Sequence, residues 1–370
     1  MNVCRGCGHA VLLRVLDVGA VPAADHFPPA ELPVAPDEGT HPLAMDLCAA
    51  CGLAQLADDD TVTSEPRGVE PQALRDQAED AVTRAERAGW LRGTTVREFG
   101  SPHGGTWLPL LAERGFASVP DGADLAADVV LDCFGIMHEP DQRAAFASRA
   151  AATAPGGVLL LQYHSLSAIV RQGQWNALRH GHFAYYSLPA LTRLLEGAGM
   201  RVVTAWNFDL YGGTVLVAAV HRDDERAAAP DGIVAAMLAA DSAVTDPDAV
   251  GALQAAADGY VTALRSWLTD KRDSGQRVYG YGAASRAVAA FAMAGLDRTL
   301  IAGVADASAA KQGRRMPGTD VPIVSPEDLV AADPDVVLLT LPDLLAEVSQ
   351  RFPRLAGRWR TDDHVATRSD

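Results

Sequence analysis

Four cysteines near the start of the chain have the spacing of a metal site. They form two Cys-x-x-Cys pairs, Cys4 with Cys7 and Cys48 with Cys51. A two-residue spacer lets both sulfurs of a pair bind one ion, and four thiolates suit structural zinc. Because such a site is closed, we expect this zinc to stabilise the fold and to take no part in catalysis. The alternative is four ordinary thiols, like Cys133, which stands in a mostly apolar run typical of core.

The composition narrows the classes of partner. The 370 residues carry a formal net charge of −16, which disfavours binding to nucleic acid or to anionic membranes. The sequence shows neither a signal-peptide pattern nor an apolar run of about 18 residues. Assigning four of the five cysteines to a metal fits a reducing compartment. We therefore expect a cytoplasmic protein of two or three domains that acts on a small molecule.

The chain divides into a metal module and two α/β units. The expected domains are residues 1–57, 70–222 and 223–358. In the middle unit, strand-like runs such as 128–134 and 158–162 alternate with helical patterns, which is typical of a doubly wound parallel sheet. A second unit of strand, glycine turn and helix begins near residue 277. It predicts another, smaller Rossmann-like domain.

Several segments carry more local predictions. Residues 18–36 are rich in Pro and Ala and are expected to be irregular, and residues 58–67 are expected to form a linker. The last dozen residues are polar, so we expect them to fray. Helices are predicted over 71–91, 141–153 and 187–199, the last with Ser187 as its N-cap, and an antiparallel hairpin is predicted from 202–206 and 213–220.

Three motifs, met in order along the chain, resemble one protein family. They are Cys48-Ala-Ala-Cys-Gly-Leu-Ala-Gln-Leu56, His180-Gly-His-Phe-Ala-Tyr-Tyr-Ser187 and Gly280-Tyr-Gly-Ala-Ala-Ser-Arg286. With them the chain resembles the S-adenosylmethionine (SAM)-dependent sugar C-methyltransferases of bacterial antibiotic pathways. The resemblance implies a zinc module, a methyltransferase domain and a C-terminal Rossmann-like domain that helps to hold the substrate. The implied chemistry is removal of a proton beside a sugar ketone, after which the enolate carbon attacks the SAM methyl group.

The SAM-binding region is shorter than the resemblance requires. The implied cofactor residues are Glu98, Gly100, Gly104, Asp121 and His138. Residues 101–127 leave room for a second strand near 116–119, but not for the third strand that shapes the adenine pocket in the family. The shortening argues against a complete SAM site, and the alternative is a domain kept as a scaffold.

The catalytic segment keeps one of the three residues that the family places near the methyl group. Where the family has tyrosine, glutamate and histidine, this chain has Arg179, Gly181 and His182. The resemblance implies that His182 is the general base, and histidine ordinarily titrates near neutral pH, which suits proton abstraction. His180 and Tyr185 are further catalytic candidates, and Arg179 offers a cation that can hold an enolate. The alternatives are an ordinary polar turn and a solvated arginine.

The C-terminal unit is expected to hold the substrate, which the resemblance implies is a nucleotide-linked sugar. Its glycine turn after a strand resembles a phosphate site backed by a cation. The predicted substrate-binding residues are Tyr186, Gly280, Gly282, Ser285, Arg286, Asp306 and Lys311. The alternative is a purely structural Rossmann repeat.

Three functions are compatible with these observations. The sequence favours a C-methyltransferase acting on a keto sugar nucleotide or a similar polyoxygenated metabolite. A SAM-independent isomerase, epimerase, lyase or cyclase is the second, because His182 and Arg179 suffice to form an enolate. A non-catalytic partner subunit is the third.

Overall fold

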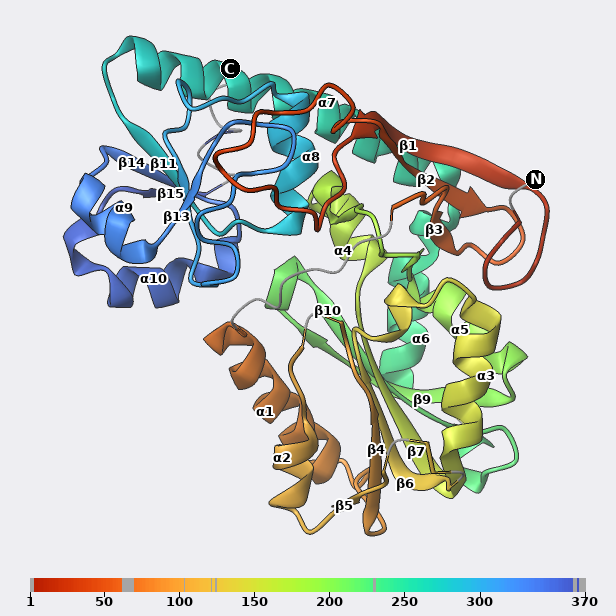
Figure 1. Ribbon diagram of the computed structural model, residues 1–370. Coiled ribbons are helices and arrows are strands. Elements are labelled where there is room, and N and C mark those ends of the chain that lie inside the picture. Colours follow the sequence, from red (N-terminus) through yellow and green to blue (C-terminus); the bar gives the residue numbers. More distant parts are fainter. Residues whose placement is uncertain are drawn as a thin grey trace.

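The protein is built on three β-sheets, which Figure 1 shows as three parts of one body. The computed structural model describes residues 3–61, 70–102, 104–120, 122–123, 125–228, 231–361 and 365. The sheets have the strand orders β1-β2-β3-β8, β5-β4-β6-β7-β10-β9 and β13-β12-β11-β14-β15. Within the described ranges, no helix is both long enough and apolar enough to span a membrane.

The N-terminal sheet joins the metal module to the motif around His182. Its strands are β1 (Leu12–Val21), β2 (His41–Cys48), β3 (Ala54–Leu56) and β8 (Ala184–Tyr185). β8 comes from the middle of the chain and pairs with β3 through Ala54 and Tyr185. The metal module therefore helps to hold the segment that carries His182. The prediction of irregular structure from residue 18 was wrong for Val18–Val21, because these residues complete β1.

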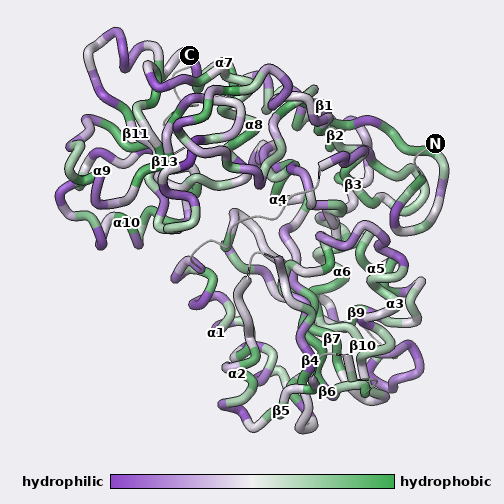
Figure 2. The backbone as a smooth tube through the Cα atoms, viewed as in Figure 1, coloured by the Kyte–Doolittle hydropathy of each residue, from purple (hydrophilic) through white to green (hydrophobic). Residues whose placement is uncertain are grey.

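The central sheet is doubly wound, as the sequence predicts. Its strands are β4 (Thr95–Phe99), β5 (Ala117–Ser118), β6 (Ala127–Cys133), β7 (Thr153–His164), β9 (Met200–Phe208) and β10 (Thr214–His221). β4 to β7 pair in parallel, and β10 pairs antiparallel with both β7 and β9. Strands β6 and β10 and residues 158–163 of β7 are mostly buried and hydrophobic, since helices cover both faces of the sheet (Figure 2).

Helices cover the two faces of the central sheet unequally. On one face lie α1 (Gln72–Arg87) and the five-residue α2 (Leu108–Ala112). On the other lie α3 (Gln142–Ala152), α5 (Leu188–Gly197) and α6 (Gly232–Ala240). The predicted N-cap of α5 is confirmed, since the Ser187 side chain accepts the Ala190 N–H.

The central sheet ends early on the β5 side. β5 has two residues, both exposed, and it is the edge strand. No third strand beyond it occurs in the part of the chain that the structure describes, as the short spacing predicts. One edge of the sheet is therefore left without the strand that the family resemblance implies.

The C-terminal sheet is entirely parallel and Rossmann-like. Its strands are β11 (Val278–Tyr281), β12 (Val304–Ala305), β13 (Ile323–Val324), β14 (Val336–Leu339) and β15 (Trp359–Arg360). Its helices are α8 (Ser285–Met293), α9 (Pro326–Ala332) and α10 (Leu345–Arg351). The expected fraying was wrong for Trp359, because its ring packs against Tyr281 and Phe352 and keeps β15 in the sheet.

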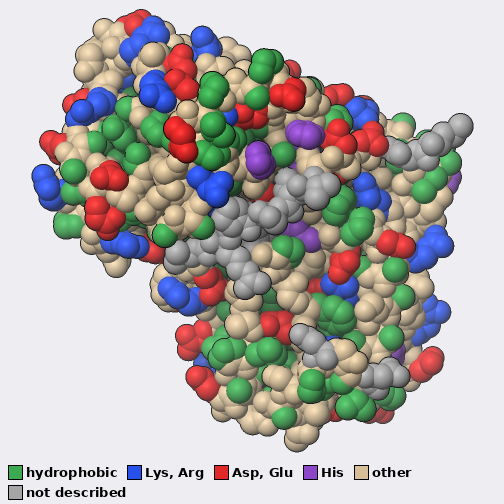
Figure 3. Space-filling model, viewed as in Figure 1, with side chains coloured by type: hydrophobic (Ala, Val, Ile, Leu, Met, Phe, Trp, Pro, Cys, Tyr) green, Lys and Arg blue, Asp and Glu red, His purple; other side chains and the backbone are tan. Residues whose placement is uncertain are grey.

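The three parts are held together by long-range contacts. The 27-residue helix α7 (Pro247–Asp273) crosses the top of the molecule and packs against β1, and the short α4 (Leu166–Arg171) lies beneath it (Figure 1). In the loop before β2, Glu38 pairs with the buried Arg315 of the C-terminal domain at 2.6 Å. Acidic and basic side chains are interspersed on the face shown in Figure 3, so the net negative charge is not gathered in one patch there.

Candidate active site

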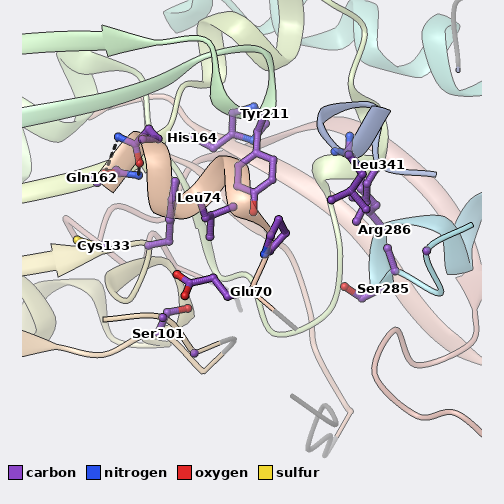
Figure 4. A pocket seen from close by; sticks show the side chains of 18 of the residues that line it. Glu70, Leu74, Ser101, Cys133, Gln162, His164, Tyr211, Ser285, Arg286 and Leu341 are labelled. Atoms are coloured by element: carbon purple, nitrogen blue, oxygen red, sulfur yellow. Dashed lines mark hydrogen bonds between the residues drawn. The ribbon is translucent and has the colours of Figure 1, made fainter. Parts of the chain in front are cut away.

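A cleft of about 290 Å³ lies between the central sheet and the C-terminal domain. One wall is the turn after β4 together with the start of α1, and the opposite wall is the glycine turn after β11. Figure 4 shows Glu70 and Ser101 on the first side and Ser285 and Arg286 on the second. The carboxyl ends of β4, β6 and β7 face this space, where parallel α/β sheets bind their ligands.

His182 and Arg179 meet in the cleft. The Arg179 Nε donates to the His182 Nε2 over 2.8 Å, so Nε2 is the unprotonated nitrogen of a neutral imidazole. The His182 side chain is buried, with 4% of the residue exposed. The His138 ring stands edge-on to it, with ring centroids 4.4 Å apart. The predicted base, the neighbouring cation and a second histidine thus form one cluster.

The segment that carries His182 is fixed from several directions. The Gly181 N–H donates to the Asp59 carboxylate over 2.8 Å, and the Gly181 carbonyl lies 3.0 Å from the His138 Nδ1. The Arg179 N–H donates to the Tyr185 hydroxyl over 3.1 Å. Tyr185 therefore positions Arg179, although the sequence suggests it as a catalytic residue.

His138 owes its position to a buried ion pair. The Asp132 carboxylate, at the end of β6, accepts the N–H groups of Gly135 and Ile136, which begin the turn that carries His138. Arg149 of α3 pairs with Asp132 at 2.8 Å, and 3% and 0% of their side chains are exposed. Burial raises the pKa of Asp132, while the Arg149 cation acts in the opposite direction.

The turn after β4 is shaped by glycines and by Glu98. The Glu98 carboxylate accepts the Trp107 N–H over 2.7 Å and the Thr106 hydroxyl, and burial raises its pKa. Gly104 and Gly105 have φ of 88° and 82°, which a side chain would strain. Glu98, Gly100 and Gly104 line the cleft as predicted.

The cleft does not extend to β5. Among the described residues of 116–127, none lines it. The predicted ribose ligand Asp121 lies outside the described residues. The structure therefore brings together the residues expected at one end of SAM, while the described residues near β5, where the adenine end is expected, lie outside the cleft.

Most of the predicted phosphate ligands in the C-terminal wall form hydrogen bonds with other groups of the protein. The Asp306 carboxylate accepts the Ala283 N–H over 2.8 Å, and the buried Lys311 donates to the Ala283 carbonyl over 2.9 Å. Ser285 accepts from Arg179 over 3.2 Å, and Arg286 donates to Asn176 over 2.8 Å. These residues line the cleft together with Gly282, but their present contacts hold the turn and join the two domains.

Three predicted site residues lie outside the cleft lining. His180 is buried against the metal module, where its Nε2 lies 3.1 Å from the Pro42 carbonyl. Tyr186 is a core residue that bonds Gln142 through its hydroxyl. Gly280 lies within β11, and an added Cβ would approach Val304 at 3.1 Å. Their positions favour structural roles, because each of them is buried and none lines the cleft.

Sequence reasoning missed several polar residues that line the cleft. Tyr211 and His164 face it from the β9–β10 turn and from the end of β7, and burial lowers the pKa of His164 to about 3. Gln162 and Gln77 exchange hydrogen bonds of 3.2 and 3.0 Å behind them. The sequence feature that could have indicated Tyr211 is the Tyr-Gly-Gly turn between two predicted strands, because two consecutive glycines indicate a turn with an unusual backbone conformation.

The four N-terminal thiols have the geometry of a zinc site. All four sulfurs lie within 4.8 Å of one another, with Cys4 to Cys51 at 3.5 Å and Cys7 to Cys48 at 3.6 Å. Four sulfurs placed tetrahedrally about 2.3 Å from zinc are separated by roughly 3.8 Å. The cluster is therefore compatible with zinc, and it lies beside β3 rather than in the cleft.

The fold combines a methyltransferase-type α/β domain with a second, Rossmann-like domain at the C-terminal end. Residues 6–205 match the family model of a methyltransferase domain, and residues 209–359 match that of the C-methyltransferase C-terminal domain. The first match covers more than half of the chain, so this protein belongs to the methyltransferase-domain family. The family resemblance and the mixed α/β fold expected from the sequence are thus confirmed.

Several individual proteins are similar to this chain. The chain is 29% identical to the C-methyltransferase NovU of Streptomyces niveus over 380 residues, covering 92% of this chain and 89% of that relative. A SAM-dependent methyltransferase from Thermotoga maritima matches with a TM-score of 0.30 and 14% identity, over 40% of this chain and 91% of that one. The glycopeptide N-methyltransferase MtfA bound to SAM matches with a TM-score of 0.28 and 14% identity, over 39% and 93%.

Proposed function

We propose that this enzyme methylates a carbon beside a ketone in a keto sugar, nucleotide-linked or similarly polyoxygenated, during the biosynthesis of a bacterial natural product. The observation that carries the proposal is the contact between His182 and Arg179 in a cleft whose walls belong to both matched domains. The match to a C-methyltransferase C-terminal domain and to NovU supports transfer to carbon. The same proposal includes three domains, with the boundaries 1–57, 70–222 and 223–358. It also includes a cytoplasmic location, because thiols stay reduced in the cytoplasm.

The chemistry begins at the Arg179–His182 pair. In the proposed reaction, the guanidinium leaves the His182 Nε2 for the substrate carbonyl oxygen, which frees the lone pair of that nitrogen. Nε2 then takes the proton from the adjacent carbon, the C–H electrons form the enolate, and Arg179 stabilises the charge on oxygen. When bound, SAM supplies an electrophilic methyl group that the enolate carbon accepts. His182 afterwards returns its proton to solvent.

The cleft fits one half of SAM better than the other. Gly100, Gly104 and the turn held by Glu98 offer exposed backbone beside the reacting cluster. At the far end the two-residue β5 is exposed and supplies no wall. For the substrate, Arg286 is the predicted phosphate ligand that faces the cleft in Figure 4. The cluster of the four N-terminal cysteines is proposed to hold a structural zinc.

Transfer of a labelled methyl group tests the proposal directly. The zinc-loaded enzyme is incubated with SAM carrying a trideuterated methyl group and a panel of nucleotide-linked keto sugars, and the products are examined by mass spectrometry. A product with a carbon-bound labelled methyl group is expected from the wild type and not from His182→Ala. Retention of full activity by His182→Ala would refute the assigned base.

A SAM-independent enolate enzyme is the second candidate. The specific observation in its favour is the central sheet that ends at β5, because lost binding surface is not rebuilt by local substitutions. This candidate predicts that the wild type exchanges the proton beside the ketone with D₂O without SAM and never transfers a methyl group. The two outcomes are distinguished in the same reaction by NMR and mass spectrometry.

A further inference from the structure

Two strained residues meet in the cleft. In the described part of the chain, three non-glycine residues have positive φ: Phe134 at 62°, Tyr211 at 55° and Asp333 at 48°. Phe134 and Tyr211 both line the cleft, and their ring centroids are 5.9 Å apart. A bulky residue in this conformation costs about 1–3 kcal/mol and persists where the surroundings impose it, often at functional sites. Two such residues in contact indicate that the positions of their side chains in the cleft matter for function.

The backbone of Tyr211 is fixed by both domains. Its N–H donates to the Asp343 carboxylate of the C-terminal domain over 3.3 Å. Its carbonyl accepts from the Gln174 amide over 3.1 Å, and the next carbonyl, that of Gly212, accepts from Gln172. The left-handed conformation is therefore held by hydrogen bonds on each side of the residue.

The Tyr211 ring extends into the cavity. In Figure 4 the Tyr211 ring extends between the side that carries Glu70 and the side that carries Arg286 and Ser285. By contrast, the Tyr185 hydroxyl accepts the Arg179 N–H and the Tyr186 hydroxyl bonds Gln142. Within the described chain, the structure shows no such protein partner for the Tyr211 hydroxyl.

The charge state of Tyr211 suits a hydrogen-bond donor. Burial raises the pKa of its phenol to about 12, although the nearby cations Arg179 and Arg286 act in the opposite direction. The phenol is thus neutral at physiological pH and keeps its proton. Because Arg179 and Arg286 both influence it, the hydroxyl also lies within electrostatic reach of the cations that face the substrate.

The sheet order separates Tyr211 from the turn that is proposed to meet SAM. The turn proposed to meet SAM follows β4, while Tyr211 immediately precedes β10. Two strands, β6 and β7, separate β4 from β10 in the sheet. This separation favours contact between Tyr211 and the molecule that receives the methyl group.

We propose that Tyr211 is a further catalytic residue, whose hydroxyl donates a hydrogen bond to the carbonyl oxygen of the substrate as that oxygen becomes an enolate. The step breaks no bond in the phenol: His182 takes the carbon-bound proton, the electron pair moves to the carbonyl oxygen, and the hydroxyl stabilises the resulting charge. The proposal rests on proton abstraction beside a ketone, which both candidate functions share, and it does not depend on SAM.

Tyr211→Phe removes the hydroxyl and keeps the ring that packs on Phe134. The matched control is Tyr279→Phe, since Tyr279 lies on β11 and is not among the residues that line the cleft. With a keto sugar that the wild type deuterates or methylates, Tyr211→Phe is expected to lower kcat by about 10²–10³-fold and to change KM little. Tyr279→Phe is expected to match the wild type. An unchanged kcat in Tyr211→Phe overturns the proposal.

A second measurement needs no substrate and separates failure of this inference from failure of the proposed function. 4-Nitrophenolate, whose phenoxide oxygen mimics an enolate, is titrated into each folded, zinc-loaded protein and followed by absorbance. The wild type and Tyr279→Phe are expected to bind it at least about tenfold more tightly than Tyr211→Phe, the effect of one hydrogen bond to a charged group. Equal affinities in all three, including equal absence of binding, contradict the proposal even if methyl transfer is established.

Discussion

Replacing Arg179 with methionine tests the contact on which the proposed chemistry depends. In the structure the Arg179 Nε donates to the His182 Nε2 over 2.8 Å, so the imidazole proton must lie on Nδ1. A hydrogen bond with one charged partner contributes about 1.5–3 kcal/mol. That free energy corresponds to a bias of roughly 10- to 150-fold toward the Nδ1–H tautomer. Arg179→Met removes the donor and is expected to abolish this bias.

The tautomer can be read by NMR without knowledge of the substrate. Long-range ¹H–¹⁵N correlations are recorded at pH 8 on protein labelled at histidine, and His182→Gln assigns the signal. The wild type is expected to show an Nδ1–H imidazole and Arg179→Met a mixture. Arg171→Met, at an exposed position at the end of α4, is the control and is expected to resemble the wild type. An Nε2–H tautomer in the wild type, or identical spectra for Arg179→Met, would refute the reasoning.

Three further predictions concern the metal module and the buried charges. Cys48→Ala removes one of four clustered thiolates, so elemental analysis is expected to show loss of bound zinc and thermal unfolding to occur at lower temperature; a full equivalent of zinc in the variant would contradict this. Arg149→Met leaves the Asp132 carboxylate buried without its cation, and urea unfolding should show a loss of about 3–5 kcal/mol. Because the folded pKa of Asp132 is raised, protonation favours the folded state, so this loss should shrink as pH falls, and a constant loss would argue against the ion pair. His164 has a pKa of about 3 in the folded protein, below its value of about 6.5 in the unfolded chain. The unfolded chain therefore takes up a proton first, and the free energy of unfolding should decrease as pH falls below about 6.5. The NMR signals of His164 should not titrate between pH 5 and 8.

The features that could be predicted from the sequence are those fixed by local pattern. The cysteine pairs, the Ser187 cap and the buried strands of the central sheet depend on spacing within a few residues, and the structure reproduces each of them. The shortened sheet could also be predicted, because residues 101–127 are too few to form two strands with their helices. Position within the family motif was enough to select His182 and Arg179.

Contacts between distant segments escaped prediction. Arg179 and Ser285 are 106 residues apart, and only the packed domains show that they share a hydrogen bond. The sequence pattern of the C-terminal turn suggests a phosphate site, yet Asp306 folds back onto Ala283 and fills part of it. Tyr211 was missed because its importance lies in a left-handed backbone conformation that Asp343 of another domain helps to hold.

The most direct test of the central claim is calorimetric titration with S-adenosylhomocysteine, the demethylated product of SAM. The wild type is expected to bind it through the turn after β4. Gly105→Val should weaken binding at least about tenfold, because this residue has a φ of 82° and an added Cβ would lie 2.8 Å from the Glu70 carboxylate. A wild type that gives no binding heat at millimolar ligand, with its zinc bound and its fold intact, would contradict methyl transfer by this enzyme.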